Sequence, residues 1–130
     1  IPYLSLTELL STSDVISLHV PLTKDTYHLL DADEFDLMKK TAFVINTSRG
    51  PVINEKALIT ALRDGKIKGA ALDVFEKEPF VPQSLREMRN VVLSPHLGTA
   101  TYETRAAMTK TAAQAIMTVF KGGRPANIVN

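Results

Sequence analysis

The stretch AFVINTSRGPVINEKALITALRDGKIKGAALDVF, residues 42–75, decides the fold. An apolar, β-rich run from Ala42 to Thr47 precedes a segment whose leucines and alanines recur at helical spacing, and a second apolar run extends from Gly69 to Phe75. Asn54 is a residue type that caps helix N-termini, and Gly65 stands where a glycine commonly ends a helix. The stretch therefore predicts a strand–helix–strand unit whose two strands run parallel.

Further helices are predicted from capping residues and apolar spacing. Ser5 with Glu8, and again Asp31 with Glu34, have the spacing of a capping box and precede apolar residues at helical intervals. A long helix is predicted over about residues 101–121, and the two glycines that follow are expected to end it.

Short apolar runs predict two more strands, at Val15–Val20 and at Val91–Ser94. Strands that are apolar throughout and alternate with helices are typical of a parallel sheet covered on both faces. The segment Glu76–Asn90, with its prolines, is expected to be a loop. The expected class is α/β.

Composition excludes several classes of protein. The 130 residues are 45% hydrophobic and 22% charged, with a net charge of +1, which gives no electrostatic reason to expect nucleic acid or an anionic membrane as a partner. No apolar stretch approaches the roughly 20 residues of a membrane-spanning helix. The chain has no cysteine, which fits a cytoplasmic protein, and its three histidines do not have the spacing of a metal site.

Ionisable residues follow three of the predicted strands. Ligands of parallel α/β sheets bind outside the carboxyl ends of the strands, where Arg49, the acidic segment Glu76–Pro79 and His96 are expected to converge. A carboxylate neighbour favours the protonated form of a histidine, which can then donate a proton to a carbonyl oxygen. An arginine fork matches a carboxylate with two hydrogen bonds. Together these groups could bind and reduce a 2-oxo acid.

Two long motifs carry a family resemblance. INTSRGPVINEKALITALRDGKIKGAALDVFEKEP (residues 45–79) and NVVLSPHLGTATYETR (residues 90–105) resemble the D-isomer-specific 2-hydroxyacid dehydrogenases, and the likeness runs from SLTELLSTSDVISLHVPLT (residues 5–23) to the closing PANIVN. The Arg-Gly-Pro of residues 49–51, HLGTAT and the final Ile-Val-Asn look most like the glyoxylate/hydroxypyruvate and 2-ketogluconate reductases. The resemblance implies hydride transfer between NAD or NADP and a small 2-oxo or 2-hydroxy acid, and a homodimer when intact.

The resemblance also assigns roles to individual residues. Arg49 would orient the substrate, His96 would be the general acid/base, and Glu78, directly before Pro79, would orient the histidine in preference to Glu76. The resemblance places the contacts to NAD(P) at Val20, Pro21, Thr47, Ser48, Arg49, Asp73, His96, Gly98 and Thr99. Among these, Asp73 would contact the carboxamide of the nicotinamide.

The implied domain is incomplete in this sequence. None of the six glycines forms the GxGxxG turn of a dinucleotide-binding domain, and the residue that distinguishes NAD from NADP is absent too. Residues 1–121 are therefore expected to be the second half of a Rossmann-type doubly wound parallel sheet, with residues 122–130 returning toward a substrate domain. Such a fragment alone is expected to bind cofactor poorly and to show no measurable turnover.

Each site residue also has a structural interpretation. Arg49 could be a surface turn residue, Glu78 a solvated loop residue, His96 a structural histidine after a Ser-Pro turn, and Asp73 a strand-end residue that bonds a neighbouring loop. His19 and His28 are expected to have no function beyond packing or solvation.

The same residues are compatible with two alternative functions. The first is a binding module like the corepressors called C-terminal binding proteins, which share the fold and the arginine, glutamate and histidine. The second is a stand-alone structural product.

Overall fold

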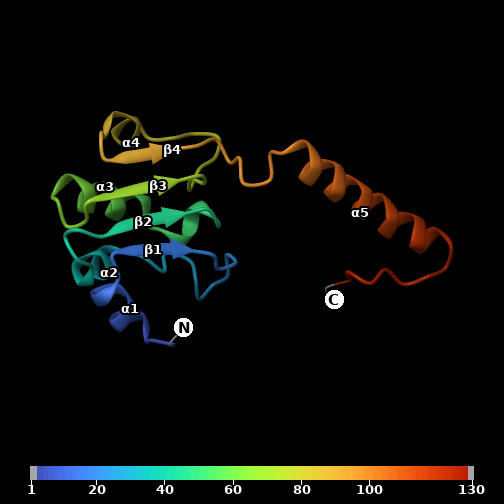
Figure 1. The fold of residues 1–130 in the computed structure, drawn as a ribbon, viewed down its shortest axis with the longest axis horizontal. Helices are drawn as coiled ribbons and strands as arrows, with labels where there is room; N and C mark the ends of the chain where they lie inside the picture. The colour runs from blue at the N-terminus through green and yellow to red at the C-terminus, as the bar shows by residue number, and fades with distance from the viewer. Residues whose placement is uncertain (1–2, 129–130) are drawn as a thin grey trace. The chain divides into compact units, whose positions relative to one another are not determined.

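The computed structural model describes residues 3–128 of the chain, so the last two residues of the closing Ile-Val-Asn lie outside the described part. Contacts divide the chain into two compact units, Ile1–His96 and Leu97–Asn130. The first unit contains the sheet and its helices, and the second contains one long helix (Figure 1).

A four-stranded parallel sheet forms the first unit. Its strands are β1 (Val15–Leu18), β2 (Phe43–Asn46), β3 (Gly69–Leu72) and β4 (Val91–Leu93), in the spatial order β1-β2-β3-β4. All the arrows point the same way in Figure 1, and all three neighbouring pairs are parallel. The four predicted strands are confirmed, although each ends one to three residues before its predicted limit. The residues that were predicted to end the strands instead follow them, and they form the carboxyl edge of the sheet.

Helices α1 (Leu6–Thr12), α2 (Ala32–Leu37) and α3 (Glu55–Arg63) begin at the predicted residues. Both predicted capping boxes are present, at Ser5 and at Asp31, and the Asn54 side chain accepts from two backbone N–H groups at the start of α3. Gly65 has a φ of 68°, the left-handed conformation that glycine adopts without strain after a helix. A short 3-10 helix, η1 (Gly50–Val52), follows β2.

The expectation of a continuous loop over Glu76–Asn90 is wrong for part of the segment. Residues Gln83–Glu87 form helix α4, whose Leu85 is fully buried in the core. The helix has no side-chain cap, because its N-cap residue is Pro82, so the usual sign of a helix start is missing from the sequence. Burial of Leu85 is the tertiary contact that stabilises this turn.

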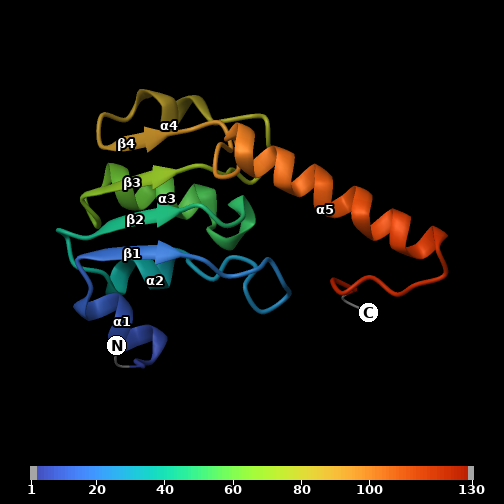
Figure 2. The same cartoon turned by 45° about the vertical axis from the view of Figure 1, so that its right-hand side comes forward.

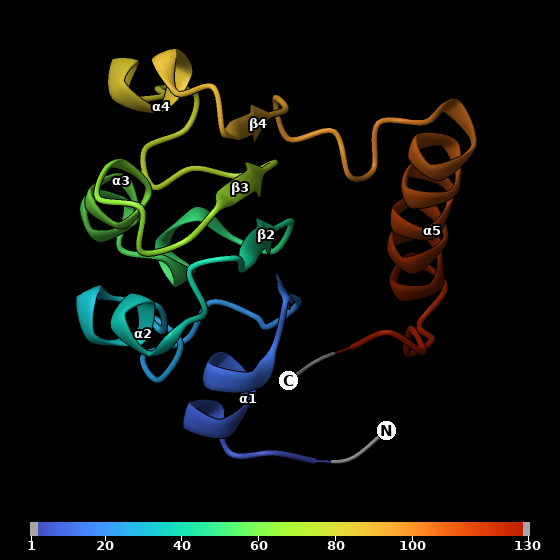
Figure 3. The ribbon, with the colours of Figure 1, turned by 60° about the vertical axis from the view of Figure 1, so that its left-hand side comes forward.

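The core lies between one face of the sheet and its helices. Figure 3 shows α2, α3 and α4 on the same side of the strands. Phe35 of α2, Val44 of β2 and Leu58 of α3 are buried there. On the opposite face Val15, Phe43 and Val92 are exposed, because successive strand residues point to opposite faces. Among the described residues of the first unit, the expected cover is therefore present on one face only.

The second unit is built around α5 (Tyr102–Phe120), which confirms the long helix predicted for residues 101–121. The Thr101 side chain caps it by accepting from the Thr104 backbone N–H at 3.2 Å. Gly122 and Gly123 donate to the last carbonyls of the helix, as expected for a glycine C-terminus. No helix among residues 3–128 is long and apolar enough to cross a membrane.

Candidate active site

The carboxyl edge of the sheet collects the predicted catalytic residues of the first unit. Arg49 follows β2, Glu78 lies in the segment after β3, and His96 follows β4. Because the strands are adjacent and parallel, their ends meet at the same edge, as the arrowheads in Figure 2 show. The structure therefore brings together residues that are separated by 18 positions or more in the sequence.

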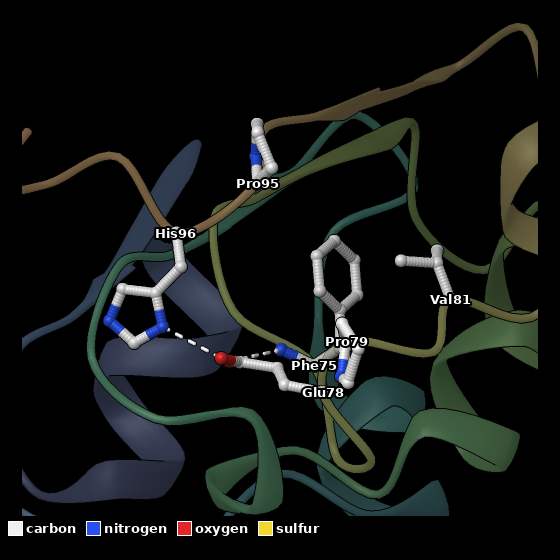
Figure 4. A pocket seen from close by; sticks show the side chains of 6 residues that line it. All are labelled: Phe75, Glu78, Pro79, Val81, Pro95 and His96. Atoms are coloured by element: carbon white, nitrogen blue, oxygen red, sulfur yellow. Dashed lines mark hydrogen bonds and ion pairs between the residues drawn. The ribbon is translucent and has the colours of Figure 1, made fainter.

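Glu78 and His96 form a hydrogen-bonded pair. The Nδ1 atom of His96 lies 2.8 Å from Oε2 of Glu78, and the other carboxylate oxygen accepts from the Phe75 backbone N–H at 3.1 Å (Figure 4). An ionised carboxylate fixes Nδ1 as the protonated nitrogen. Nε2 is then the nitrogen through which the ring can exchange a proton with a substrate. The His96 side chain is 47% exposed and the Glu78 side chain 35%, so small molecules can reach the pair.

The backbone holds His96 in an uncommon conformation. Its φ is 55°, in the left-handed region that non-glycine residues seldom occupy, and its N–H donates to the Asp73 carbonyl at 2.9 Å. Such conformations are found at functional sites, where the surrounding structure compensates for the strain. This hydrogen bond, from the segment after β4 to the segment after β3, therefore fixes the backbone from which the imidazole extends.

The pKa of Glu78 is lowered from its ordinary value. The hydrogen bond from His96 is the largest cause, and the Phe75 N–H and the charges of His96 and Arg49 act in the same direction, against partial burial. Glu78 is thus ionised at neutral pH and can stabilise an imidazolium.

Removing the imidazole should change the titration of Glu78. In His96→Ala we expect the Glu78 pKa to rise toward its ordinary value, since its largest stabilising hydrogen bond is lost. A lowered folded-state pKa contributes stability that is present above the unfolded pKa and is lost as pH falls through the folded value. The variant should therefore be less stable than the wild type at neutral pH. Its free energy of unfolding should also decrease less as the pH falls into the acid range.

Carboxyl-detected NMR titration measures the first effect, and urea unfolding at several pH values measures the second. Glu8 is the internal control, because its pKa is lowered by Ser5 and should not respond to the substitution. An unchanged Glu78 pKa in the variant would contradict the pairing.

Arg49 is placed by an unusually close backbone contact at Gly50. A Cβ atom on Gly50 would lie 1.9 Å from the Phe75 carbonyl carbon and 2.0 Å from its oxygen, closer than any real Cβ approaches. Only glycine fits, which lets the segment after β2 lie directly against the segment that leads to Glu78. The Arg49 guanidinium donates to the Ser48 carbonyl at 2.7 Å.

Asn46 is a site-proximal residue that sequence reasoning missed. It is the last residue of β2, it is 1% exposed, and its side chain bonds to both Ser48 and Arg49. The sequence did contain a sign of this role, because Asn46 is a polar residue at an inward-facing position of an otherwise apolar strand. The sequence interpretation treated this residue as part of the strand only.

Part of the predicted cofactor set lines one hollow at the carboxyl ends of β1 and β2. The hollow measures about 610 Å³, and it is lined by His19, Val20, Pro21, Leu22, Thr47, Ser48 and Arg49. Apolar side chains from one loop face polar groups from the other, the mixture found in small-molecule and cofactor sites. A hollow with this mixed lining fits part of a dinucleotide. Val20, Pro21, Thr47 and Ser48 are the residues that would hold it.

Asp73 is buried beside this edge, with 7% of its surface exposed. It accepts from the Ser94 hydroxyl at 2.5 Å, and Ser94 directly follows β4. The predicted contact of Asp73 to the nicotinamide carboxamide stays a prediction. Gly98 and Thr99 belong to the second unit, and their cofactor contacts stay predictions.

A second histidine–glutamate pair lies deeper in the first unit. His28 Nε2 is 2.8 Å from Glu76 Oε1, which also accepts from the Glu55 backbone N–H at 3.1 Å, and the His28 ring stacks on Tyr27. Burial, followed by the charge of Glu76, raises the pKa of Glu55. Glu76 is thus engaged with His28 and Glu78 with His96. The expectation of ordinary packing or solvation for His28 omitted this hydrogen bond.

Comparisons with known proteins identify the family. Residues 1–98 match the family model described as D-isomer specific 2-hydroxyacid dehydrogenase, NAD binding domain. This chain therefore belongs to the D-isomer specific 2-hydroxyacid dehydrogenases. It is 51% identical over 128 residues to the glyoxylate reductase of Thermococcus litoralis, an alignment that covers 98% of this chain and 39% of that protein.

Solved structures agree in fold. The NAD complex of the D-isomer specific 2-hydroxyacid dehydrogenase from Lactobacillus delbrueckii ssp. bulgaricus is 34% identical, with a TM-score of 0.87 over 98% of this chain and 43% of that one. The NADPH-dependent glyoxylate/hydroxypyruvate reductase from Sinorhizobium meliloti, in complex with NADP and malonate, is 37% identical, with a TM-score of 0.87 over 89% of this chain and 36% of that one.

These findings confirm the family, the α/β fold and the class of cofactor, NAD or NADP. The chain spans about two fifths of the length of the relatives it matches.

Proposed function

We propose that residues 1–121 are the second half of the dinucleotide-binding domain of a dehydrogenase as long as its relatives, with residues 122–130 leading to a substrate domain. The reaction is hydride transfer between NAD(P)H and C2 of a small 2-oxo acid, of the glyoxylate or hydroxypyruvate type, to give a D-2-hydroxy acid. The hydrogen-bonded Glu78–His96 pair at the strand ends carries this proposal. Similarity to the Thermococcus litoralis and Sinorhizobium meliloti reductases supports the substrate type.

Arg49 binds and orients the substrate in this proposal. Its guanidinium offers two parallel N–H donors, which match a carboxylate in one plane and leave the adjacent carbonyl directed toward the acid/base. Gly50 packs against the Phe75 backbone and so fixes the place of Arg49 relative to the Glu78 segment. Arg49 thus places the reacting carbon relative to His96.

His96 moves the proton. Its Nε2–H donates to the carbonyl oxygen as negative charge develops there, and in the reverse direction Nε2 takes the proton from the hydroxyl. Glu78 keeps Nδ1 protonated and stabilises the imidazolium, because its carboxylate accepts that hydrogen bond at 2.8 Å. The bound nicotinamide supplies or accepts the hydride at C2. The chain itself contributes orientation and charge stabilisation.

The alternative is a nicotinamide-sensing binding module with little turnover. The same arginine, glutamate and histidine could be retained in such a protein, so the two functions differ in rate and assembly rather than in residues. As an enzyme, the full-length protein is proposed to be a cytoplasmic homodimer that forms with or without cofactor.

Two measurements on the full-length protein separate the functions. Turnover of hydroxypyruvate and glyoxylate with NADH and NADPH is followed by loss of the reduced nicotinamide, and mass is measured by light scattering with and without cofactor. Turnover on the order of 1–10³ per second, with unchanged mass, supports the enzyme. Negligible turnover together with cofactor-dependent assembly supports the binding module.

A further inference from the structure

We propose that Asn46 is a positioning residue for the reaction, which fixes the backbone of Arg49 so that its guanidinium meets the substrate carboxylate. The inference rests on the proposed function, since it takes Arg49 as the substrate-binding group. It adds a buried residue that touches neither substrate nor cofactor in the proposed mechanism.

The Asn46 side chain uses both ends of its amide on the segment that follows β2. Its Oδ1 accepts from the Ser48 N–H at 3.0 Å and from the Ser48 hydroxyl at 2.8 Å, and its Nδ2 donates to the Arg49 carbonyl at 3.0 Å. The residue is 1% exposed, so solvent does not replace any of these bonds. A buried amide with both ends engaged has one satisfied orientation, which in turn fixes the two residues it bonds.

Arg49 is held from its other side by Gly50. The backbone of Gly50 lies against Phe75 so closely that no Cβ fits, whereas the bond from Asn46 acts on the carbonyl of Arg49 itself. The long arginine side chain has many rotamers, so a fixed backbone limits the places its guanidinium can reach. A displacement of about 1 Å in such a group can cost about 100-fold in rate.

The two ends of the amide have separable tasks. Ser48 lines the hollow at the ends of β1 and β2, so the Oδ1 bonds act on the proposed cofactor side. The Nδ2 bond acts on Arg49, which lines the same hollow and is the proposed substrate-binding group. A substitution that removes only the donor should therefore weaken substrate binding much more than cofactor binding.

Asn46→Asp is such a substitution. At neutral pH its carboxylate keeps the acceptor for Ser48 but has no hydrogen to donate to the Arg49 carbonyl. When protonated, the carboxyl group again carries one donor and one acceptor, and burial makes protonation easier. Lowering the pH should therefore restore the hydrogen bond to the Arg49 carbonyl in this variant.

The test uses the full-length protein and four measurements on each variant. These are the dissociation constant for NADH, that for oxamate (an unreactive isostere of a 2-oxo acid) in the presence of cofactor, the ratio kcat/KM for hydroxypyruvate, and the pH profile of that ratio. Asn90→Asp is the matched control, because Asn90 also donates from Nδ2 to a backbone carbonyl, that of Lys68. It lies at the opposite, amino end of β4.

We expect Asn46→Asp at neutral pH to weaken oxamate binding and to lower kcat/KM by about 10-fold to 100-fold, with NADH binding within about 2-fold of wild type. The ratio of variant to wild-type kcat/KM should rise as pH falls. Asn46→Ala should weaken both ligands and show no such rise, and Asn90→Asp should behave like the wild type.

Wild-type oxamate binding in Asn46→Asp, or a pH ratio that stays flat, would overturn the inference. If the wild-type protein itself reduces no 2-oxo acid, the proposed function fails and the inference falls with it. Where a variant lacks the native circular dichroism spectrum, NMR of the wild type decides. Slowly exchanging Asn46 amide hydrogens that shift on oxamate addition support the positioning role, and rapid exchange with no shift contradicts it.

Discussion

Replacing His96 by alanine in the full-length protein is expected to lower turnover by about 10²-fold to 10⁴-fold, the usual contribution of a positioned acid/base. The variant loses the group that donates the proton to the developing alkoxide. Cofactor affinity should stay close to that of the wild type, because the hollow at the ends of β1 and β2 does not include this ring. Steady-state kinetics and fluorescence titration with NADH measure the two quantities.

His28→Ala is the matched control for this prediction. Both histidines have a positive φ, and both pair with a glutamate at 2.8 Å, but His28 pairs with Glu76 and stacks on Tyr27. Its loss should reduce stability and leave kcat within a few-fold of wild type in the folded protein. Equal kinetic losses in the two variants, or near wild-type turnover in His96→Ala, would contradict the assignment of the acid/base.

Arg49→Lys should be nearly as damaging, although it keeps the charge. A lysine ammonium is a point charge without the planar fork, so it cannot hold a carboxylate by two parallel bonds. We expect kcat/KM for hydroxypyruvate to fall by about 10²-fold or more, which corresponds to roughly 3 kcal/mol of transition-state stabilisation. The loss should appear mainly in KM and in the affinity for oxamate.

A substrate without a carboxylate tests whether this loss comes from anion binding. Hydroxyacetone is a poor substrate for such a site, and its rate should be nearly the same in wild type and Arg49→Lys. Arg63→Lys, at the end of α3, is the control for the substitution itself. An equal loss with both substrates would show that Arg49 acts through the fold and not through the carboxylate.

Local signals in the sequence predicted the elements of this fold well. The capping boxes at Ser5 and Asp31, and the Asn54 cap with Gly65, each combine a residue type with a spacing, and such information lies within a few positions of the chain. Helix α4 was missed because it is short, begins at a proline without a side-chain cap and depends on the burial of Leu85.

The sequence predicted those site residues that follow a strand. It did not predict contacts between residues that only the folded chain brings together. Arg49 and His96 each stand a few residues after an apolar run, so parallel topology alone places them at one edge. The His28–Glu76 pair spans 48 positions, and no periodicity links its members. Asn46 looked like the end of a strand, because its three bonds depend on how the next residues turn back.

The chirality of the product tests the proposed reaction most directly. Hydroxypyruvate is the substrate to use, since reduction of glyoxylate gives an achiral product. The full-length protein is incubated with hydroxypyruvate and reduced nicotinamide cofactor, and the glycerate formed is resolved by chiral chromatography. The proposed reaction gives D-glycerate with the wild type and almost none with His96→Ala. L-glycerate, or no product with either NADH or NADPH, would contradict it.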